Sequence, residues 1–409
     1  MRSVDDVLKK HFGKSLASEG VHILDPFTGT GTFIVRTLTY LQEQMNNGEI
    51  SLADITRKFM QELHANEIIL LSYYIAAINI ESTFDEINGD EQGYEPFEGI
   101  VLTDTFESTE DENTLDDTYF GTNDERLKRQ QEVPITAIIG NPPYSAKQTS
   151  VNDNNANIKY PILDKRIAET YVAHSTSNNK NNLYDSYIKA FRWSSDRLGN
   201  RGVIGFVTNA GFIDGDAVSG LRKSLFEEFN HLYIFNLRGD QRTSGETSRK
   251  EGGKIFGSGS RTPIAISILI KDDSDNHELY YHDIGDYLSR EDKLGILSEV
   301  KSVSGLDWKY INPDVNNDWI NQRDENYLSY SAVSDETSSV FLKRGVGLGS
   351  SRDPWVISFS KQNLLNNSKR MVSEFNNQVQ TISNETDLEM DMTKINWSDD
   401  LIKRWQKNK

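Results

Sequence analysis

The chain alternates short apolar runs with segments in which apolar residues recur at helical spacing. Strands are predicted where the apolar runs end at Gly, Pro, Asn or Asp, over 21–25, 99–106, 135–144, 202–212, 231–237, 262–270 and 278–284. Helices are predicted between them, over 33–45, 67–81, 183–198 and 217–229. This alternation is typical of an α/β fold with a parallel sheet, helices on both faces and ligands bound beyond the carboxyl ends of the strands.

The pattern changes twice along the chain. Residues 145–182 are rich in Asn and Ser, and we interpret them as a long mobile insertion. After about residue 335 the alternation gives way to mixed polar sequence with aromatic residues. We therefore predict one α/β domain over 1–335 and the beginning of a second domain over 336–409.

The composition is that of a globular protein with two or three domains. Of the 409 residues, 36% are hydrophobic and 26% are charged. The absence of Cys excludes disulfides, Cys-ligated zinc and a thiolate nucleophile, and the seven His show no metal-binding spacing, so no metal is expected. The apolar stretches 68–80 and 264–270 are too short to cross a bilayer, and the N-terminus does not resemble a signal peptide. We expect a cytoplasmic protein.

The charge is unevenly distributed. The net charge is −18, but residues 81–125 alone contain sixteen Asp and Glu and no Lys or Arg. Residues 180–261 hold thirteen Lys and Arg against nine Asp and Glu, which is a net +4. Because binding depends on local potential, the acidic block cannot lie against a phosphate backbone, whereas the later stretch could.

A glycine-rich turn follows the first predicted strand, in the sequence DPFTGTGTF (25–33). Glycines let the backbone approach a ligand closely, and the N-terminus of the following helix offers free N–H groups. The turn lacks the Gly-Lys-Ser/Thr ending of a P-loop, and Ile34 replaces the third glycine of the dinucleotide-binding fingerprint. The alternative interpretation is a plain tight turn.

Two acidic residues follow the turn in the chain. Glu67 is expected at the start of a helix, where its carboxylate could accept hydrogen bonds from both hydroxyls of a ribose. Its alternative role is that of an N-terminal acid favoured by the helix dipole. Asp104 closes the next predicted strand and could equally be a turn or cap residue.

The strongest motif is Asn-Pro-Pro-Tyr at residues 141–144, directly after a buried strand. The two prolines restrict the backbone, so that carbonyl groups point outward. Asn141 adds a side-chain acceptor, and Tyr144 adds a flat face for stacking. Together these groups form a receptor for a planar amine, although a plain strand-ending turn could have the same sequence.

The motifs DPFTGTGTF, ANEI, TDTF and NPPY, in this order, resemble those of amino-group DNA methyltransferases of the gamma-type adenine-N6 group. The stretches 182–215 and 237–271 resemble the methyltransferase region of type ISP restriction–modification enzymes. Those enzymes join nuclease, helicase, methyltransferase and target-recognition domains in one polypeptide. The resemblance covers about residues 1–375. It implies a Rossmann-like methyltransferase fold, with a mostly parallel seven-stranded sheet, followed by the start of a target-recognition region.

The resemblance also implies a cofactor, S-adenosyl-L-methionine, and the residues that bind it. The glycine turn would surround the methionine portion, through Asp25, Phe27, Thr28, Gly29, Gly31 and Thr32. Glu67 would hold the ribose, and Asp104 would bind the amino group of the cofactor's adenine.

The catalytic residues implied by the resemblance are Asn141, Pro142, Pro143 and Tyr144. Asn141 and the Pro142 carbonyl would accept hydrogen bonds from the N6 amine of an adenine in double-stranded DNA. Tyr144 would stack on that adenine, which must be flipped out of the duplex to reach the methyl group.

The sequence departs from the family in two respects. A further cofactor motif, with a Tyr-Thr-Pro-like segment, normally precedes the stretch matching Arg2–Val7 and is absent here, so the chain resembles a fragment. There is also no Walker A motif, and helicase and nuclease domains would belong to the rest of a longer polypeptide. The alternatives are methylation of a protein glutamine or of RNA, and a DNA-recognition fragment without activity.

Two later segments could contact DNA. Residues 238–261 contain six Lys and Arg and six Gly, which suits either phosphate contact or a solvated loop. The segment 345–360 resembles the entry to a recognition domain, where Arg352, Asp353 and Trp355 could meet DNA or simply pack.

Overall fold

The structure is a computed structural model. It describes residues 1–89, 93–110, 121–143, 159–175, 177, 180–257, 261–323, 326, 329–331, 340–341 and 353–385. The chain forms two compact units, Met1–Arg323 and Asp324–Lys409. The boundary near residue 335 inferred from composition stays a prediction. The described helices of the second unit are α11 (Asp353–Val356) and α12 (Lys361–Glu385).

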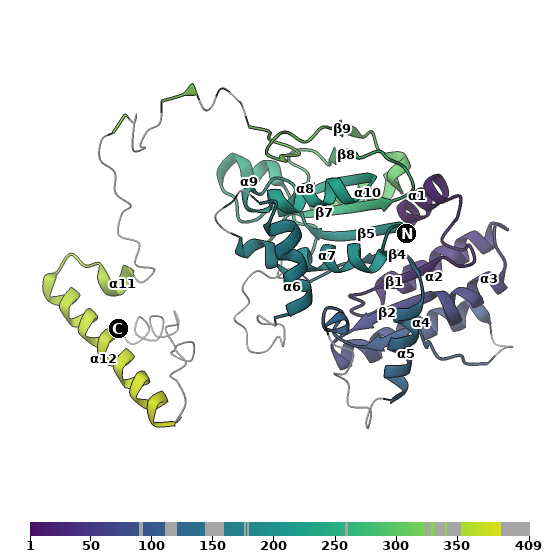
Figure 1. Ribbon diagram of the computed structural model, residues 1–409, viewed down its shortest axis with the longest axis horizontal. Helices are drawn as coiled ribbons and strands as arrows, with labels where there is room; N and C mark the ends of the chain where they lie inside the picture. The colour runs from purple at the N-terminus through teal and green to yellow at the C-terminus, as the bar shows by residue number, and fades with distance from the viewer. Residues whose placement is uncertain are drawn as a thin grey trace. The chain divides into compact units, whose positions relative to one another are not determined.

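The first unit is built on one large sheet (Figure 1). Its order is β3-β2-β1-β4-β5-β7-β6-β8-β9. The strands are β1 (His22–Asp25), β2 (Leu63–Glu67), β3 (Ile100–Leu102), β4 (Ile135–Gly140), β5 (Gly202–Asn209), β6 (His231–Arg238), β7 (Ile264–Lys271), β8 (Glu278–Asp283) and β9 (Lys309–Ile311). All pairs from β3 to β5 are parallel, as is β6 with β8, whereas β7 is antiparallel to both of its neighbours and β9 is antiparallel to β8.

The α/β class and the mostly parallel sheet are confirmed, but the expected number of seven strands is wrong. The described residues form nine strands, because β2 and β9 were not predicted. β2 has the polar sequence Leu-His-Ala-Asn-Glu, and all five residues are buried. Its polar side chains form hydrogen bonds inside the protein: the Nε2 of His64, for example, lies 3.0 Å from the Nδ1 of His22. Such a strand carries no apolar run for a sequence pattern to detect.

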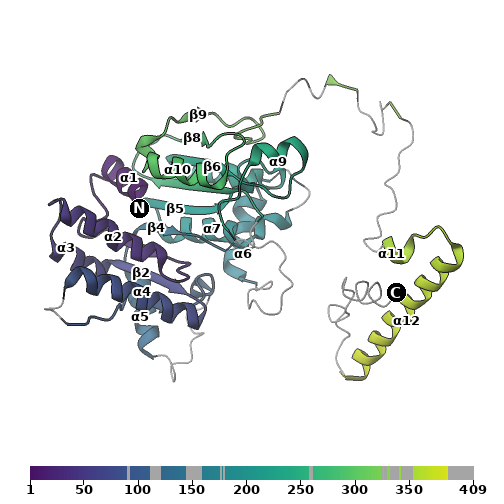
Figure 2. The same cartoon turned by 180° about the vertical axis from the view of Figure 1, so that it is seen from behind.

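Helices cover both faces of the sheet, and neighbouring residues of the inner strands point to opposite sides. Ile23 belongs to the core under one helical layer, and Leu24 belongs to the core under the other. The helices of this unit are α1 (Arg2–Phe12), α2 (Thr32–Asn46), α3 (Leu52–Arg57), α4 (Leu70–Asn88), α5 (Gly121–Glu132), α6 (Pro161–Ile167), α7 (Ser186–Leu198), α8 (Ser219–Glu228), α9 (Gly245–Glu251) and α10 (Arg290–Val300). Figure 2 shows α2 and α4 side by side on one face.

The segment interpreted as a mobile insertion, 145–182, is partly helical. Residues 145–158 lie outside the described residues. Helix α6 and a π-helical turn, Ala168–Val172, follow them and bury Leu163, Ile167 and Tyr171 in the core. This part of the segment is therefore folded, which its Asn- and Ser-rich composition did not indicate. Among the described residues, no helix combines the length and apolar character needed to span a bilayer.

Candidate active site

Four strand ends bring the predicted site residues to one edge of the sheet. Asp25 ends β1 and Glu67 ends β2, while Asn141 directly follows β4 and Asp104 lies just beyond β3. These strands are neighbours and run parallel, so their carboxyl ends lie at the same edge. A cavity of about 610 Å³ opens there, lined among others by Phe27, Gly29, Glu67, Asp104, Asn141 and Pro143.

The glycine turn has a left-handed, close-packed conformation that glycine adopts without strain. Gly29 has φ +57° and Gly31 has φ +88°, in the left-handed region that favours glycine. A Cβ on Gly31 would lie 3.2 Å from the backbone of Ala76 in α4, so the turn and this helix are in close contact. Thr28 is buried and donates from its backbone N–H to the Asn66 carbonyl at 3.0 Å, and Thr32 is exposed at the first position of α2.

Glu67 connects this turn to the second strand. Its Oε2 accepts a hydrogen bond from the Gly29 N–H at 2.7 Å, and its Oε1 accepts one from the Ile69 N–H at 2.8 Å. The prediction that Glu67 starts a helix is wrong: it ends β2, and α4 begins at Leu70. A carboxylate has about four acceptor positions, so two remain for a ligand in the cavity.

Asp104 is held by a residue that the sequence analysis missed. Its Oδ1 accepts from the Phe106 N–H at 2.9 Å, and its Oδ2 accepts from the Tyr160 hydroxyl at 2.8 Å. Burial and the negative charge of Asp104 raise the pKa of Tyr160, so the phenol stays protonated and remains a donor. Lys189 of α7 lies 4.8 Å from the centre of the Tyr160 ring and forms an ion pair with Asp164 at 2.6 Å.

Asp25 lies beneath the turn and has no access to solvent. Its Oδ1 accepts a hydrogen bond from the Phe27 N–H at 3.1 Å, whereas its Oδ2 has no hydrogen-bond partner in the part of the chain that the structure describes. Complete burial raises the pKa of Asp25 to about 8. Asp25 is therefore mostly a neutral carboxylic acid at pH 7 rather than a free negative charge.

The Asn-Pro-Pro segment lies at the edge of the same cavity. The Asn141 Oδ1 is buried and has no hydrogen-bond partner among the described residues. Pro142 is buried and Pro143 is exposed. The fourth residue of the motif, Tyr144, lies outside the described residues, so its stacking role stays a prediction.

The largest part of the missed site comes from the 3-10 turn Asn181–Tyr184, which precedes α7, and from the first residue of α7. Asn181, Asn182, Tyr184, Asp185 and Ser186 all line the cavity. The apolar pattern of 183–198 predicted the helix, but it did not indicate which end of the helix faces the strand ends. The signal that could have located it is the polar, aromatic sequence NNLYDS just before the apolar stripe.

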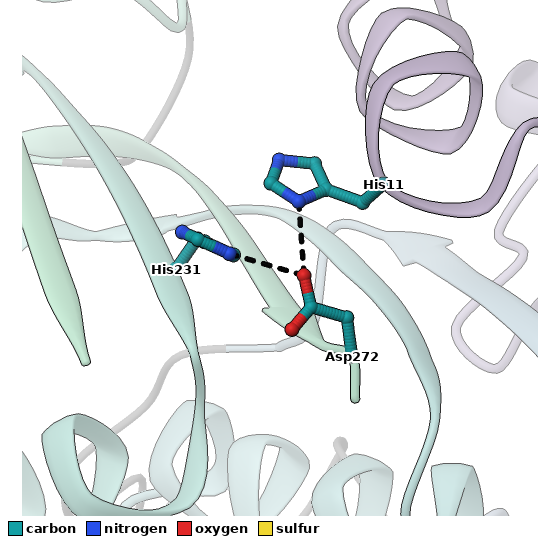
Figure 3. Close-up of side chains that lie close together, drawn as sticks. All are labelled: His11, His231 and Asp272. Atoms are coloured by element: carbon teal, nitrogen blue, oxygen red, sulfur yellow. Dashed lines mark hydrogen bonds and ion pairs between the residues drawn. The ribbon is translucent and has the colours of Figure 1, made fainter. Parts of the chain in front are cut away.

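A histidine cluster lies away from this cavity, where β6 begins and β7 ends (Figure 3). It is the group in the described part of the chain with the composition and spacing to hold a metal. His11 Nδ1 and His231 Nε2 each lie 3.0 Å from Asp272 Oδ2, and His231 Nδ1 lies 2.9 Å from Glu278. A metal-bound histidine usually donates its second N–H to an acceptor. His11 Nε2 is buried and no described residue forms a hydrogen bond with it, so hydrogen bonding to Asp272 explains this cluster better than a metal does.

The basic segment 238–261 makes several internal ion pairs and hydrogen bonds. Arg238 pairs with Asp283 and Asp286, and Arg242 pairs with Asp240. In the second unit, Asp353 begins α11 and Trp355 is buried, while Arg352 lies outside the described residues.

Comparison with protein families gives two matches. Residues 54–243 match the Eco57I restriction-modification methylase family, and residues 339–409 match the Type ISP C-terminal specificity domain. A search of the curated proteins finds no match. The fold of the first unit and the match of residues 54–243 make it similar to Rossmann-like methylases of the restriction–modification class.

Solved structures narrow this class further. A nuclease-deletion mutant of the Type ISP restriction-modification enzyme LlaGI, in complex with a DNA substrate mimic, is 69% identical with a TM-score of 0.90. The match covers 95% of this chain and 32% of that one. The ATP-dependent Type ISP enzyme LlaBIII bound to DNA is 55% identical with a TM-score of 0.87, covering 99% and 27%. The DrdV–DNA complex is 36% identical with a TM-score of 0.82, covering 92% and 37%.

The chain thus corresponds to the methyltransferase region of a Type ISP restriction–modification enzyme, together with sequence of its specificity domain. The resemblance inferred from the four motifs is confirmed. The chain spans about a third of the length of the solved enzymes that it matches.

Proposed function

We propose that this chain transfers the methyl group of S-adenosyl-L-methionine to the N6 amine of an adenine flipped out of double-stranded DNA. The observation that carries the proposal is the buried, unpartnered Asn141 Oδ1 at the edge of a cavity that the glycine turn also lines. The matches to a restriction-modification methylase family and to Type ISP enzymes bound to DNA support it.

The residues around the cavity fit the cofactor. A volume of about 610 Å³ lies within the range of small-molecule sites. Glu67 and Asp104 line this cavity and keep free acceptor positions after their protein hydrogen bonds. We therefore assign the methionine portion to the glycine turn, the ribose to Glu67 and the adenine amino group to Asp104.

When bound, the cofactor supplies an electrophilic methyl group. Asn141 Oδ1 and the Pro142 carbonyl accept hydrogen bonds from the target amine and orient its lone pair toward that group. No strong base is needed, because these two acceptors stabilise the positive charge that develops on the amine as it reacts. The folded strand ends hold both acceptors in place before the substrate arrives, which reduces the entropy lost on reaching the reactive geometry.

Methylation of RNA or of a protein glutamine is the second enzymatic candidate. The match of residues 339–409 to a specificity domain and the DNA in the related structures favour DNA. A recognition fragment without activity remains a distinct outcome of the experiment below. Our proposal places the chain within a longer cytoplasmic polypeptide that also carries helicase and nuclease domains, as part of a restriction–modification system.

The test is the variant Asn141→Ala in the full-length polypeptide. Unmethylated DNA is incubated with the cofactor, digested to nucleosides and analysed by mass spectrometry for N6-methyladenine. We expect the variant to lose a factor of about 10²–10³ in the rate of transfer, because one transition-state hydrogen bond is removed. Calorimetric titration should give nearly unchanged cofactor affinity, since Asn141 contacts the target amine.

The matched control is Asn47→Ala, at an exposed position just after α2. It should behave like the wild type in both measurements. Near-wild-type transfer by Asn141→Ala, or the appearance of N4-methylcytosine in place of N6-methyladenine, would contradict the proposal. Cofactor binding without transfer to any DNA would favour the inactive fragment.

A further inference from the structure

Helix α4 has two apolar faces, and only one of them is buried. Ala76, Ile80, Phe84 and Ile87 recur at helical spacing and pack into the core beside α2. The opposite face carries large apolar side chains that are exposed to solvent: Leu71 is 69% exposed, Tyr74 56%, Ile75 38% and Ile78 61%. The residues leading into the helix, Ile68, Ile69 and Leu70, are also 40–59% exposed. We call this surface, formed by 68–71, 74, 75 and 78, the α4 face.

An exposed apolar surface of this kind indicates that another segment or protein binds there. Single exposed apolar residues are common, but contiguous groups of them mark interaction sites in folded proteins. On a solvated helix, polar residues occupy the outer face, and α4 itself returns to that pattern further along. Ser82, Asp85 and Glu86 continue the same stripe and are exposed. The stripe is therefore apolar over its first two turns and polar beyond them, and it ends with two acidic residues.

We infer that the α4 face binds an amphipathic helix from the remainder of the full-length polypeptide, with basic residues where that helix meets Asp85 and Glu86. This inference rests on the proposed multidomain arrangement. In the three solved enzymes the matched region is 32%, 27% and 37% of the chain, so most of each polypeptide lies outside it and is available as a partner. The apolar-to-acidic order of the stripe sets the charge of the occupant by complementarity.

The dimensions of the α4 face suit a helix. Leu71, Ile75 and Ile78 form a ridge at i, i+4 and i+7, which is the surface that packs into the groove of a second helix. From Leu71 to Glu86 the stripe is sixteen residues long, and at a rise of ~1.5 Å per residue its ends are about 22 Å apart. The occupant therefore needs about four turns.

The α4 face borders the candidate active site. Ile68, Ile69 and Ser72 line the same cavity as Glu67 and Asp104. A helix packed on this face would cover that side of the cavity. Docking should therefore increase the affinity for the cofactor, because the bound ligand loses contact with solvent there.

The absence of Cys from the chain allows a direct test. Leu71→Cys, Ile78→Cys and the control Ser298→Cys, at an exposed position of α10, are introduced one at a time into the 409-residue chain and into the full-length polypeptide. Maleimide labelling of each cysteine is followed by peptide mass spectrometry. We expect labelling at positions 71 and 78 to be at least tenfold slower in the full-length polypeptide, and labelling at position 298 to be unchanged.

The charge complementarity has its own variant. Asp85→Lys combined with Glu86→Lys should restore fast labelling of Ile78→Cys in the full-length polypeptide, while Glu291→Lys, an exposed acid of α10, should not. Equal labelling rates in the two forms would overturn the inference. So would a dimer of the 409-residue chain that Ile78→Glu dissociates in sedimentation velocity, because the occupant would then be a second copy.

DNA methylation measured on the same samples separates the two proposals. Full-length protein that forms N6-methyladenine but labels rapidly at positions 71 and 78 would refute the docking helix and leave the proposed function standing. Protein that is protected at both positions but forms no N6-methyladenine would refute the function and leave the docking surface standing.

Discussion

The buried Asp25 should make the protein less stable as the pH rises. Its pKa is raised from an ordinary value of 3.8 to about 8, because burial disfavours the carboxylate. Below pH 4 the group is protonated in both the folded and unfolded states. Between pH 4 and 8 the unfolded chain releases this proton while the folded chain keeps it, so the free energy of unfolding falls with rising pH. Above pH 8 this contribution is constant.

The replacement Asp25→Asn removes this pH dependence. Asn has nearly the same shape, is always neutral and can keep the hydrogen bond from the Phe27 N–H. At pH 7 the carboxyl group is about three pH units above its ordinary pKa, which corresponds to about 4 kcal/mol. Allowing for imperfect packing of the amide, we expect the variant to be about 2–4 kcal/mol more stable at pH 7.

The assay is urea unfolding of the cofactor-free protein at pH 5, 6, 7 and 8, with extrapolation to zero denaturant. The gain from Asp25→Asn should grow steadily across this series. Asp54→Asn is the control, since hydrogen bonds from Ser51 lower the pKa of Asp54 to about 2 and its effect should be constant over this range. A gain from Asp25→Asn that is absent, independent of pH, or larger at pH 5 than at pH 8 would refute the reasoning.

Two further predictions concern the walls of the cavity. Gly31→Ala should destabilise the protein by about 1–3 kcal/mol in urea unfolding, because φ is +88° and the new Cβ would press on the Ala76 backbone. Gly29→Ala should destabilise it clearly less, because its Cβ would meet no atom within 4 Å. Equal losses of stability in the two variants would contradict this explanation. Tyr160→Phe should weaken cofactor binding about two- to tenfold in calorimetric titration, because Asp104 loses the hydroxyl that positions it. Tyr184→Phe should change the cofactor affinity less. An unchanged affinity in Tyr160→Phe would remove Asp104 from the proposed cofactor site.

The sequence alone predicted the α/β class, most of the strands and the motifs at the strand ends. These features are local, since an apolar run followed by Gly or Pro indicates a strand and the loop after it. β2 could not be predicted in this way, because His64, Asn66 and Glu67 make it polar although it is fully buried. The sequence therefore predicted Glu67 at the start of a helix, whereas it is the last residue of the preceding strand.

Residues that complete the cavity from distant parts of the chain were also missed. Tyr160 lies 56 residues after Asp104, and its role depends on the packing of α6 beside α7. Apolar residues at 160, 163, 167 and 171 recur at helical spacing, but the Asn- and Ser-rich sequence on either side led to the interpretation as an insertion. Only tertiary packing brings this hydroxyl to the carboxylate, so no local pattern could indicate it.

The anchoring of the first helix affects the order in which the chain can fold as it is synthesised. One side of α1 can form early, since Asp5 accepts a hydrogen bond from Tyr40, only 35 residues later. The contacts on the other side of α1 form much later, because His11 pairs with Asp272, which is synthesised 261 residues after it. At typical rates of translation this delay is roughly 10–50 s. During this time the nascent chain exposes the surface of α1 that β6 and β7 later cover, and a chaperone that binds apolar segments would find α1 accessible there.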